Sequence, residues 1–209
     1  MKSILLVLVF FLFAASCSSS KLVQQYTNPE VINFEATKVL VIGITSDKEL
    51  RMAFETQLTQ AIEAKGTKAV KSVDFLETPF TDEKKTEEQL DEIEYQLLEL
   101  GFDGVLFTKI IGQESKTSAA QSYREFAQTY ERFNDYYFGN QYVYQKAQEE
   151  STQIYHTETS YFCLCPGKEK ELMWRGKIDL ETSKQVNKNM YDYIKTLVRA
   201  FKENEILNY

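Results

Sequence analysis

The sequence is poor in the residues from which metal centres and nucleophilic catalytic sites are usually built. Its 209 residues include one histidine, His156, and three cysteines. A single histidine excludes a metal site built from several imidazoles, and a Ser–His or Cys–His catalytic pair would have to use it. It also excludes phospholipase-D-type phosphatidyl transfer, the chemistry of cardiolipin synthases, which needs two motifs that each carry a histidine and a lysine. We expect His156 to be an ordinary strand residue.

Glycine-rich phosphate loops and basic clusters are also missing. Neither G-x-x-x-x-G-K nor G-x-G-x-x-G occurs, so no loop is expected to cradle phosphate. The chain has 24 Lys and Arg against 31 Asp and Glu, a net charge of −7, and its basic residues form no dense cluster. Nucleic acid and direct adhesion to anionic lipid are therefore not expected. We expect no cofactor, no metal and no enzymatic activity, because no catalytic constellation is found.

The amino terminus has the pattern of a secretion signal. An apolar run over residues 4–15 follows Met1 and Lys2 and is too short for a stable bilayer span. The residues that end it, FAASC, resemble the bacterial lipobox, in which small residues precede a cysteine that is diacylated on sulfur. This resemblance implies a signal peptide over residues 1–16 and lipidation of Cys17. The alternative is an ordinary cleaved signal in which Cys17 is incidental.

Residues 17–35 are expected to be the lipidated end and a polar tether. Three serines follow Cys17, Pro29 lies within the segment, and no clean periodicity is present. Serine directly after the cysteine resembles lipoproteins that are passed to the outer membrane, and no acidic cluster of the surface-export type follows. We expect a bacterial envelope protein, anchored to the outer membrane and facing the periplasm.

The chain is organised around residues 38–66, which predict one strand–helix unit. The nearly unbroken aliphatic run of residues 38–44 is typical of a strand buried on both faces. Ser46 with Glu49 predicts a capping box at the start of a helix, and Gly66 predicts a left-handed end.

The remaining pattern predicts one α/β domain over residues 36–209. We expect a mixed sheet in two or three layers with flanking helices, ordered βαβαβ and followed by a long hairpin and a closing helix. A polar loop is expected over residues 74–85. The further elements are a strand at 68–73, a helix from the capping box of Thr86 and Gln89 to Gly101, a strand at 102–112, hairpin strands at 152–164 and 171–180, and a helix from Ser183.

Residues 113–150 interrupt this order with an excursion rich in tyrosine and phenylalanine. One interpretation is that the rings bury themselves against the sheet or each other. The other is a surface for a protein partner or for self-association, because tyrosine is favoured at interface cores. A glycan that stacks on the rings is a further alternative. The candidate contact residues are Tyr123, Phe126, Tyr130, Tyr136, Tyr137, Phe138, Tyr142 and Tyr144.

Cys163 and Cys165 form a C-x-C motif before Pro166. In an extended strand, Cα atoms two residues apart are about 6.5 Å from each other, at the upper edge of disulfide reach, so a bond requires a bent strand end. A local disulfide and two free or partner-linked thiols both remain open. A catalytic redox pair is less favoured, because no helix start follows to lower a thiol pKa.

Several of these stretches together resemble a broad set of bacterial envelope lipoproteins. They are KVLVIGI, a helix with Arg51 and Glu55 four residues apart, GFDGVLF, TETSYF, LMWRGKIDL and the closing helix. The domain resembles those of the curli-secretion channel lipoprotein, the lipoprotein activators of penicillin-binding proteins and the amino-terminal domain of the Tol translocation protein. We treat Arg51 and Glu55 as a structural surface or partly buried pair.

This resemblance implies a non-enzymatic adaptor or assembly protein that works through protein–protein contacts. Its expected partner is another envelope protein or a second copy of itself, and the process it serves is not specified. The alternatives are a thiol-dependent envelope redox protein that uses Cys163 and Cys165, or a glycan binder.

Overall fold

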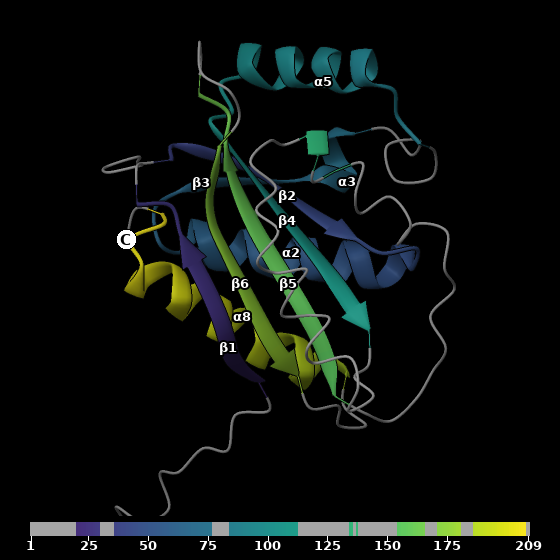
Figure 1. Ribbon diagram of the computed structural model, residues 1–209. Coiled ribbons are helices and arrows are strands. Elements are labelled where there is room, and N and C mark those ends of the chain that lie inside the picture. Colours follow the sequence, from purple (N-terminus) through teal and green to yellow (C-terminus); the bar gives the residue numbers. More distant parts are fainter. Residues whose placement is uncertain are drawn as a thin grey trace, which may run out of the picture.

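The strand predicted at residues 38–44 lies inside a single six-stranded sheet (Figure 1). The computed structural model describes residues 20–29, 36–76, 84–112, 134–135, 137, 154–165, 171–180 and 186–207. Its elements are β1 (Ser20–Thr27), β2 (Lys38–Ile44), α2 (Lys48–Glu63), β3 (Lys68–Lys71), α3 (Ser72–Phe75), α5 (Glu87–Glu99), β4 (Gly104–Gly112), β5 (Tyr155–Cys163), β6 (Leu172–Leu180) and α8 (Val186–Glu203).

The sheet is mixed, as the sequence predicts. Its strand order is β1-β6-β5-β4-β2-β3, with β2 parallel to both β3 and β4 and the other neighbours antiparallel. The parallel part comes from the strand–helix units, and the antiparallel part contains the predicted hairpin of β5 and β6. The α/β fold class is therefore confirmed.

Both faces of β2 are buried, which explains its nearly continuous apolar sequence. Val39 and Val41 belong to one hydrophobic core, and Leu40, Ile42 and Ile44 belong to a second core on the other side of the sheet. When the side chains on both faces of a strand lie in a hydrophobic core, no position of the strand suits a polar residue. The prediction of a doubly covered strand is confirmed.

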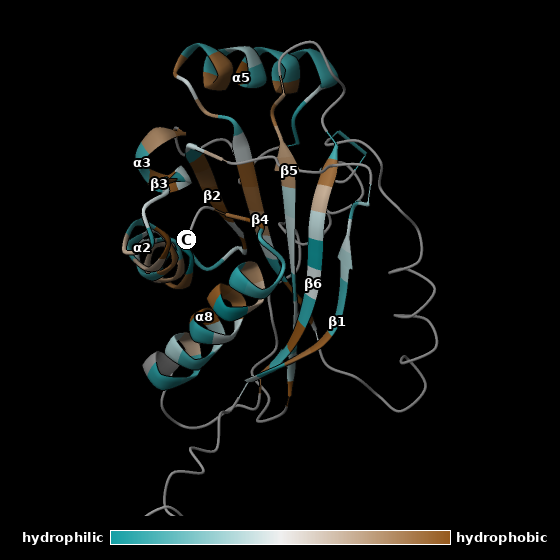
Figure 2. Cartoon of the chain, turned by 90° about the vertical axis from the view of Figure 1, so that its left-hand side faces the viewer, coloured by the Kyte–Doolittle hydropathy of each residue, from teal (hydrophilic) through white to brown (hydrophobic). Residues whose placement is uncertain are grey.

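Helices α2 and α8 cover the first face of the sheet (Figure 2). Tyr193, Leu197 and Phe201 of α8 are buried there, and the ring of Phe201 meets Trp174 of β6 edge-on at 5.2 Å between centroids. This confirms the closing helix and its apolar face. On the second face, Leu90 and Leu97 of α5 pack at one end. The described part thus has two full layers and α5 as a partial third.

The helix ends follow their local sequence, with one exception. Thr86 and Gln89 form the predicted capping box of α5, and Gly66 and Gly101 have φ of 104° and 74° after their helices. The exception is α2, whose cap is Asp47 and not Ser46. The Asp47 side chain accepts a hydrogen bond from the Leu50 amide, because a carboxylate one residue later also suits this position.

Two segments expected to be irregular contain regular structure. Part of the polar loop predicted over residues 74–85 belongs to the short helix α3. More importantly, the segment expected as a tether contains β1, which pairs with β6 from Ser20 to Thr27 with one register shift between Leu22 and Gln24. Edge strands need few apolar residues because one edge and one face remain partly exposed, so a polar sequence such as SKLVQQYT can still pair.

Candidate functional site

At the end of the sheet where β1 begins, the described chain comes closest in sequence to Cys17. Ser20, the first residue of β1, follows Cys17 by three positions. Three extended residues span at most about 10 Å. A lipid on Cys17 would therefore hold this end of the sheet directly at a membrane surface. The expectation of a polar tether over residues 17–35 was wrong for residues 20–27, which form β1. Cys17 itself lies outside the described residues.

Ser20 is fastened to the closing helix by two hydrogen bonds. Its hydroxyl donates to the backbone carbonyl of Asp192 at 2.7 Å and lies 2.6 Å from the hydroxyl of Thr196. Ser20 and Thr196 are both 8% exposed. The start of β1 is thus fixed to the middle of α8, and a pull on residue 17 would be transmitted to both elements.

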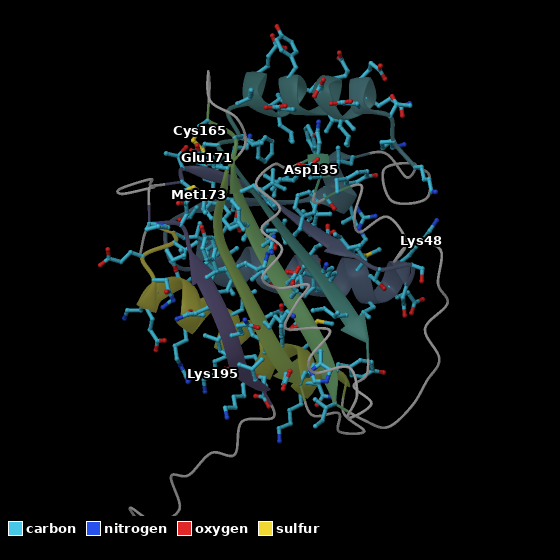
Figure 3. All side chains as sticks on the ribbon, in the orientation of Figure 1. Lys48, Asp135, Cys165, Glu171, Met173 and Lys195 are labelled. Carbon is cyan, nitrogen blue, oxygen red and sulfur yellow. A yellow bond between two sulfur atoms is a disulfide. The ribbon has the colours of Figure 1, made fainter. Side chains whose placement is uncertain are left out.

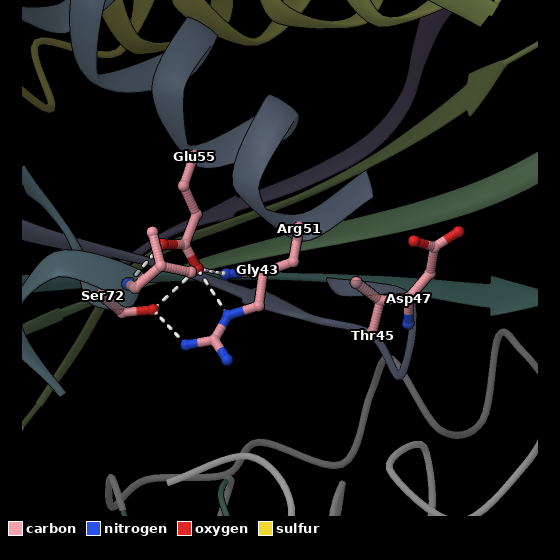
Figure 4. Close-up of polar contacts among 7 residues, drawn as sticks. Gly43, Thr45, Asp47, Arg51, Glu55 and Ser72 are labelled. Atoms are coloured by element: carbon pink, nitrogen blue, oxygen red, sulfur yellow. Dashed lines mark hydrogen bonds and ion pairs between the residues drawn. The ribbon is translucent and has the colours of Figure 1, made fainter. Parts of the chain in front are cut away.

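A second polar group is the buried network around Glu55 of α2 (Figure 4). One Glu55 carboxylate oxygen accepts from Arg51 Nε at 2.9 Å, from the Ser72 hydroxyl at 2.7 Å and from the Gly43 amide at 2.9 Å. The other oxygen accepts from the Val73 amide at 3.0 Å. Arg51 Nη2 in turn donates to Ser72 at 2.6 Å.

The network joins three elements and has no exposed carboxylate. Glu55 is fully buried, and Arg51 is 8% exposed. The expectation of a surface or partly buried pair was wrong, because the carboxylate also accepts amide donors from the end of β2 and the start of α3. A buried charge with this many donors holds elements in place. The structural role predicted for the two residues agrees with this geometry.

A third group consists of charged side chains on the second face of β4, β5 and β6. Glu158 stands in register between Lys109 and Lys177, and the Lys109 ammonium lies 3.2 Å from the Glu158 carboxylate. In the next row, Arg175 donates through Nε to the Ser160 hydroxyl at 3.1 Å. All five side chains are at least nine-tenths buried.

Burial dominates the electrostatics of this charged face. It lowers the pKa of Lys109, and the nearby cations of Arg175 and Lys177 lower it further, whereas Glu158 opposes the shift. The cations outnumber the carboxylate here, so the face would favour an anion, but its burial leaves no open approach. We therefore assign these residues to packing rather than to binding.

His156 lies at the end of this face and is hydrogen-bonded to Asp179. Its Nδ1 is 2.5 Å from the Asp179 carboxylate on the neighbouring strand, with which it is in register. His156 therefore contacts a neighbouring strand of the sheet, which agrees with the prediction that it is an ordinary strand residue. Among the described residues, no group of three or more His, Cys, Asp and Glu is arranged to hold a metal ion.

Cys163 and Cys165 are joined in a disulfide at the opposite end of the sheet from Ser20 (Figure 3). Their Cα atoms are 5.3 Å apart, closer than in an extended strand, so the chain bends where β5 ends. Cys163 is 1% exposed and belongs to the first core. This placement fits a bond that fixes a strand end.

Most of the aromatic excursion lies outside the described residues. This applies to Tyr123, Phe126, Tyr130, Tyr136, Phe138, Tyr142 and Tyr144. Tyr137 is described and is 1% exposed, within the second core beside residues of β4 and α5. Its burial raises the pKa of its hydroxyl to about 12. Tyr137 is thus a packing residue, whatever the role of its neighbours.

Sequence reasoning missed the charged face, although a signal for it was present. In β6, charged residues recur at every second position, at Arg175, Lys177 and Asp179, whereas residues 156–160 of β5 are all polar. The alternation places the charged residues on one face of β6, and the register of β5 places Ser160, Glu158 and His156 beside them. Within the described residues, no helix combines the length and apolar character needed to cross a bilayer.

Comparison with known proteins gives only weak likenesses. No protein-family model matches the chain, and no curated protein matches its sequence. Among solved structures, a PelC dodecamer from Paraburkholderia phytofirmans aligns with a TM-score of 0.43 and 8% identity over 86% of this chain and 94% of that one. Lipoprotein GNA1162 from Neisseria meningitidis aligns with a TM-score of 0.41 and 11% identity over 80% of this chain and 97% of that one. Likenesses at this level carry no argument about what this chain binds or how it assembles.

Proposed function

We propose that this chain is a lipid-anchored protein of the bacterial envelope that acts without catalysis, by contact with an envelope protein or with copies of itself. The observation that carries the proposal is the position of Cys17. The lipobox-like segment ends three residues before β1, and β1 is fixed to both β6 and α8. A lipid on Cys17 would hold the whole domain against the membrane that contains it.

The ionisable side chains of the described residues support a role by contact. Glu55 accepts from Arg51 and from the amides of Gly43 and Val73. His156 is paired with Asp179, and Lys109 with Glu158. These groups are engaged in joining secondary-structure elements. Acid–base catalysis instead uses groups held within reach of a substrate.

The proposed location is the periplasmic side of the outer membrane. Ser18 directly follows Cys17, and no acidic cluster follows it. Cell fractionation tests the anchor: the full chain should be found with the outer membrane, and the Cys17→Ser variant should be released. Equal membrane retention of the two forms would contradict it.

The proposed partner surface is the aromatic excursion, without Tyr137. Deleting residues 119–148 would remove this core residue, so point variants test the surface better. We expect crosslinking in intact cells to capture a partner, or a second copy, with the wild type. Combined Tyr123→Ala, Tyr130→Ala, Tyr142→Ala and Tyr144→Ala substitutions should abolish the capture. Tyr95, which is 60% exposed on α5, supplies the matched control Tyr95→Ala.

Equal capture by the wild type and the combined variant would contradict this surface. The thiol-dependent alternative makes a different prediction. It requires that the double variant Cys163→Ser, Cys165→Ser lose its activity in the cell while its free energy of unfolding stays unchanged. The contact proposal instead predicts that any loss follows the loss of folded protein.

A further inference from the structure

The exposed side of α8 carries a stripe of positive charge. Its members are all exposed and lie three or four positions apart, so they share one side of the helix. The opposite side of the helix packs on the sheet. We call this set the α8 stripe, and it consists of Lys188, Tyr191, Lys195, Arg199 and Lys202.

The stripe departs from the charge of the rest of the chain. The whole protein has a net charge of −7, and along the sequence these cations are separated by uncharged and acidic residues, which is why the sequence alone predicted no adhesion to anionic lipid. The helix brings these four cations to one side, where one carboxylate, Asp192, lies four positions after Lys188 and three before Lys195, so an excess of positive charge remains. The nearest acids are Asp192, which is partly buried, and Glu203 and Glu205, which are exposed at the carboxyl end.

The stripe lies beside the attachment point of the domain. Ser20 bonds to Asp192 and Thr196, which are the neighbours in sequence of Tyr191 and Lys195. Figure 3 shows Lys195 beside the end of β1 that begins at Ser20. Lys188 and Lys202 are each seven residues from Lys195, or about 10 Å along a helix. Every cation of the stripe is therefore close to the point from which the chain leads to Cys17.

The far end of the domain has the opposite charge. Helix α5 lies at the other end of the sheet from the start of β1 (Figure 1). Its exposed residues include Glu87, Glu88, Asp91, Glu92 and Glu99. An anionic surface would attract the α8 stripe and repel α5, so the charge distribution itself would orient the domain.

We propose that the α8 stripe is a second membrane contact, which binds the headgroups of anionic phospholipids in the bilayer that holds the lipid on Cys17. This inference rests on the proposed lipid anchor. Basic side chains near a membrane surface strengthen the attachment of a lipidated protein, and tyrosine is favoured at the headgroup level. Tyr191, 61% exposed in the middle of the cations, matches that environment.

The test uses the chain from residue 17 with Cys17→Ser, which keeps every described element but cannot be acylated. Its binding to vesicles of phosphatidylcholine alone, or with phosphatidylglycerol, is measured by co-sedimentation at low and high salt. We expect binding only to the anionic vesicles, with loss at high salt. Combined Lys195→Gln and Arg199→Gln should weaken it about thirtyfold, since each cation near the surface contributes about fivefold.

The matched control is Lys65→Gln with Lys68→Gln, the same loss of charge at exposed positions. Lys68 begins β3, in register with the first residue of β2 and thus at the end of the sheet away from Ser20. The control should bind as the parent does. Absent binding to anionic vesicles, or an equal loss in the control, would overturn the inference.

Acylation is measured separately, as the mass of the full-length protein extracted from membranes. Acylated Cys17 with no vesicle binding by the stripe would leave the anchor standing and overturn the membrane contact. Unmodified Cys17 with stripe-dependent vesicle binding would overturn the anchor and support the contact. The two failures are therefore distinguishable.

Discussion

The hydroxyl of Ser20 lies 2.6 Å from that of Thr196, across 176 positions of sequence. The bond joins the first residue of the sheet to the helix that closes the fold. Both residues are buried, so neither hydroxyl can exchange this partner for bulk water. The contact makes the attachment end of the domain a fixed part of its core.

Replacing Ser20 with Ala should lower the free energy of unfolding by about 1–3 kcal/mol. The substitution removes the donor to the Asp192 carbonyl and leaves the Thr196 hydroxyl without this partner. Urea unfolding measures the effect. The exposed neighbour Lys21 provides the control Lys21→Ala, which should change stability by less than about 0.5 kcal/mol. Equal effects of the two substitutions would contradict the fastening of β1 to α8.

Replacing Glu55 with Gln should destabilise the fold by about 3 kcal/mol or more. The Arg51 charge would lose its counter-ion inside the protein, and the new amide group would face a hydrogen-bond donor. Glu63 lies on the same helix and is exposed, so Glu63→Gln is the matched control. Guanidinium unfolding of both variants tests the prediction. A loss for Glu55→Gln below about 1 kcal/mol would show that the network is not satisfied as described.

Gly176→Ala should cost about 1–3 kcal/mol through overpacking. A Cβ atom at this position would come within 2.6 Å of Cζ2 of the Trp174 ring on the same strand. Trp174→Phe shortens that ring, so the double variant should be more stable than the sum of the two single effects predicts. Thermal unfolding of the two single variants and the double variant measures whether their effects on stability are additive. Strictly additive effects would exclude contact between the glycine and the ring.

The free energy of unfolding should decrease as the pH rises above about 10, and part of this decrease should come from Tyr137. Burial raises the pKa of this tyrosine from 10.0 to about 12, so between these values the folded state holds a proton that the unfolded state has lost. By linkage, the stabilisation present below pH 10 is lost as the pH rises through 12. Urea unfolding between pH 9 and pH 11.5 should give a flatter profile for Tyr137→Phe. Parallel profiles for the variant and the wild type would contradict the burial of this hydroxyl.

The buried strands and the amphipathic helices could be predicted because their signals are local. The aliphatic run of β2, the capping box of Thr86 and Gln89, and the periodic face of α8 each specify an element within a few turns of chain. The cap at Asp47 shows the limit of such signals. Ser46 and Asp47 are both good caps, and the backbone path decides between them.

β1 and the α8 stripe could not be predicted because each depends on distant residues. The sequence SKLVQQYT becomes a strand only by pairing with β6, which follows it by more than a hundred residues. The α8 stripe is visible as a helical spacing, but its exposure depends on which side of α8 packs on the sheet, and its position depends on Ser20. The charged face of β5 and β6 was the exception, because the alternation of Arg175, Lys177 and Asp179 in β6 already indicates it.

The central claim is that a lipid on Cys17 holds the first strand of the domain at a membrane surface. The most direct test is the mass of the tagged full-length protein purified from the membrane fraction, together with that of its amino-terminal peptide. The account predicts a chain that begins at Cys17 and carries acyl chains, and an unacylated product for Cys17→Ser. A chain that begins at another residue, or an unmodified Cys17, would contradict the account.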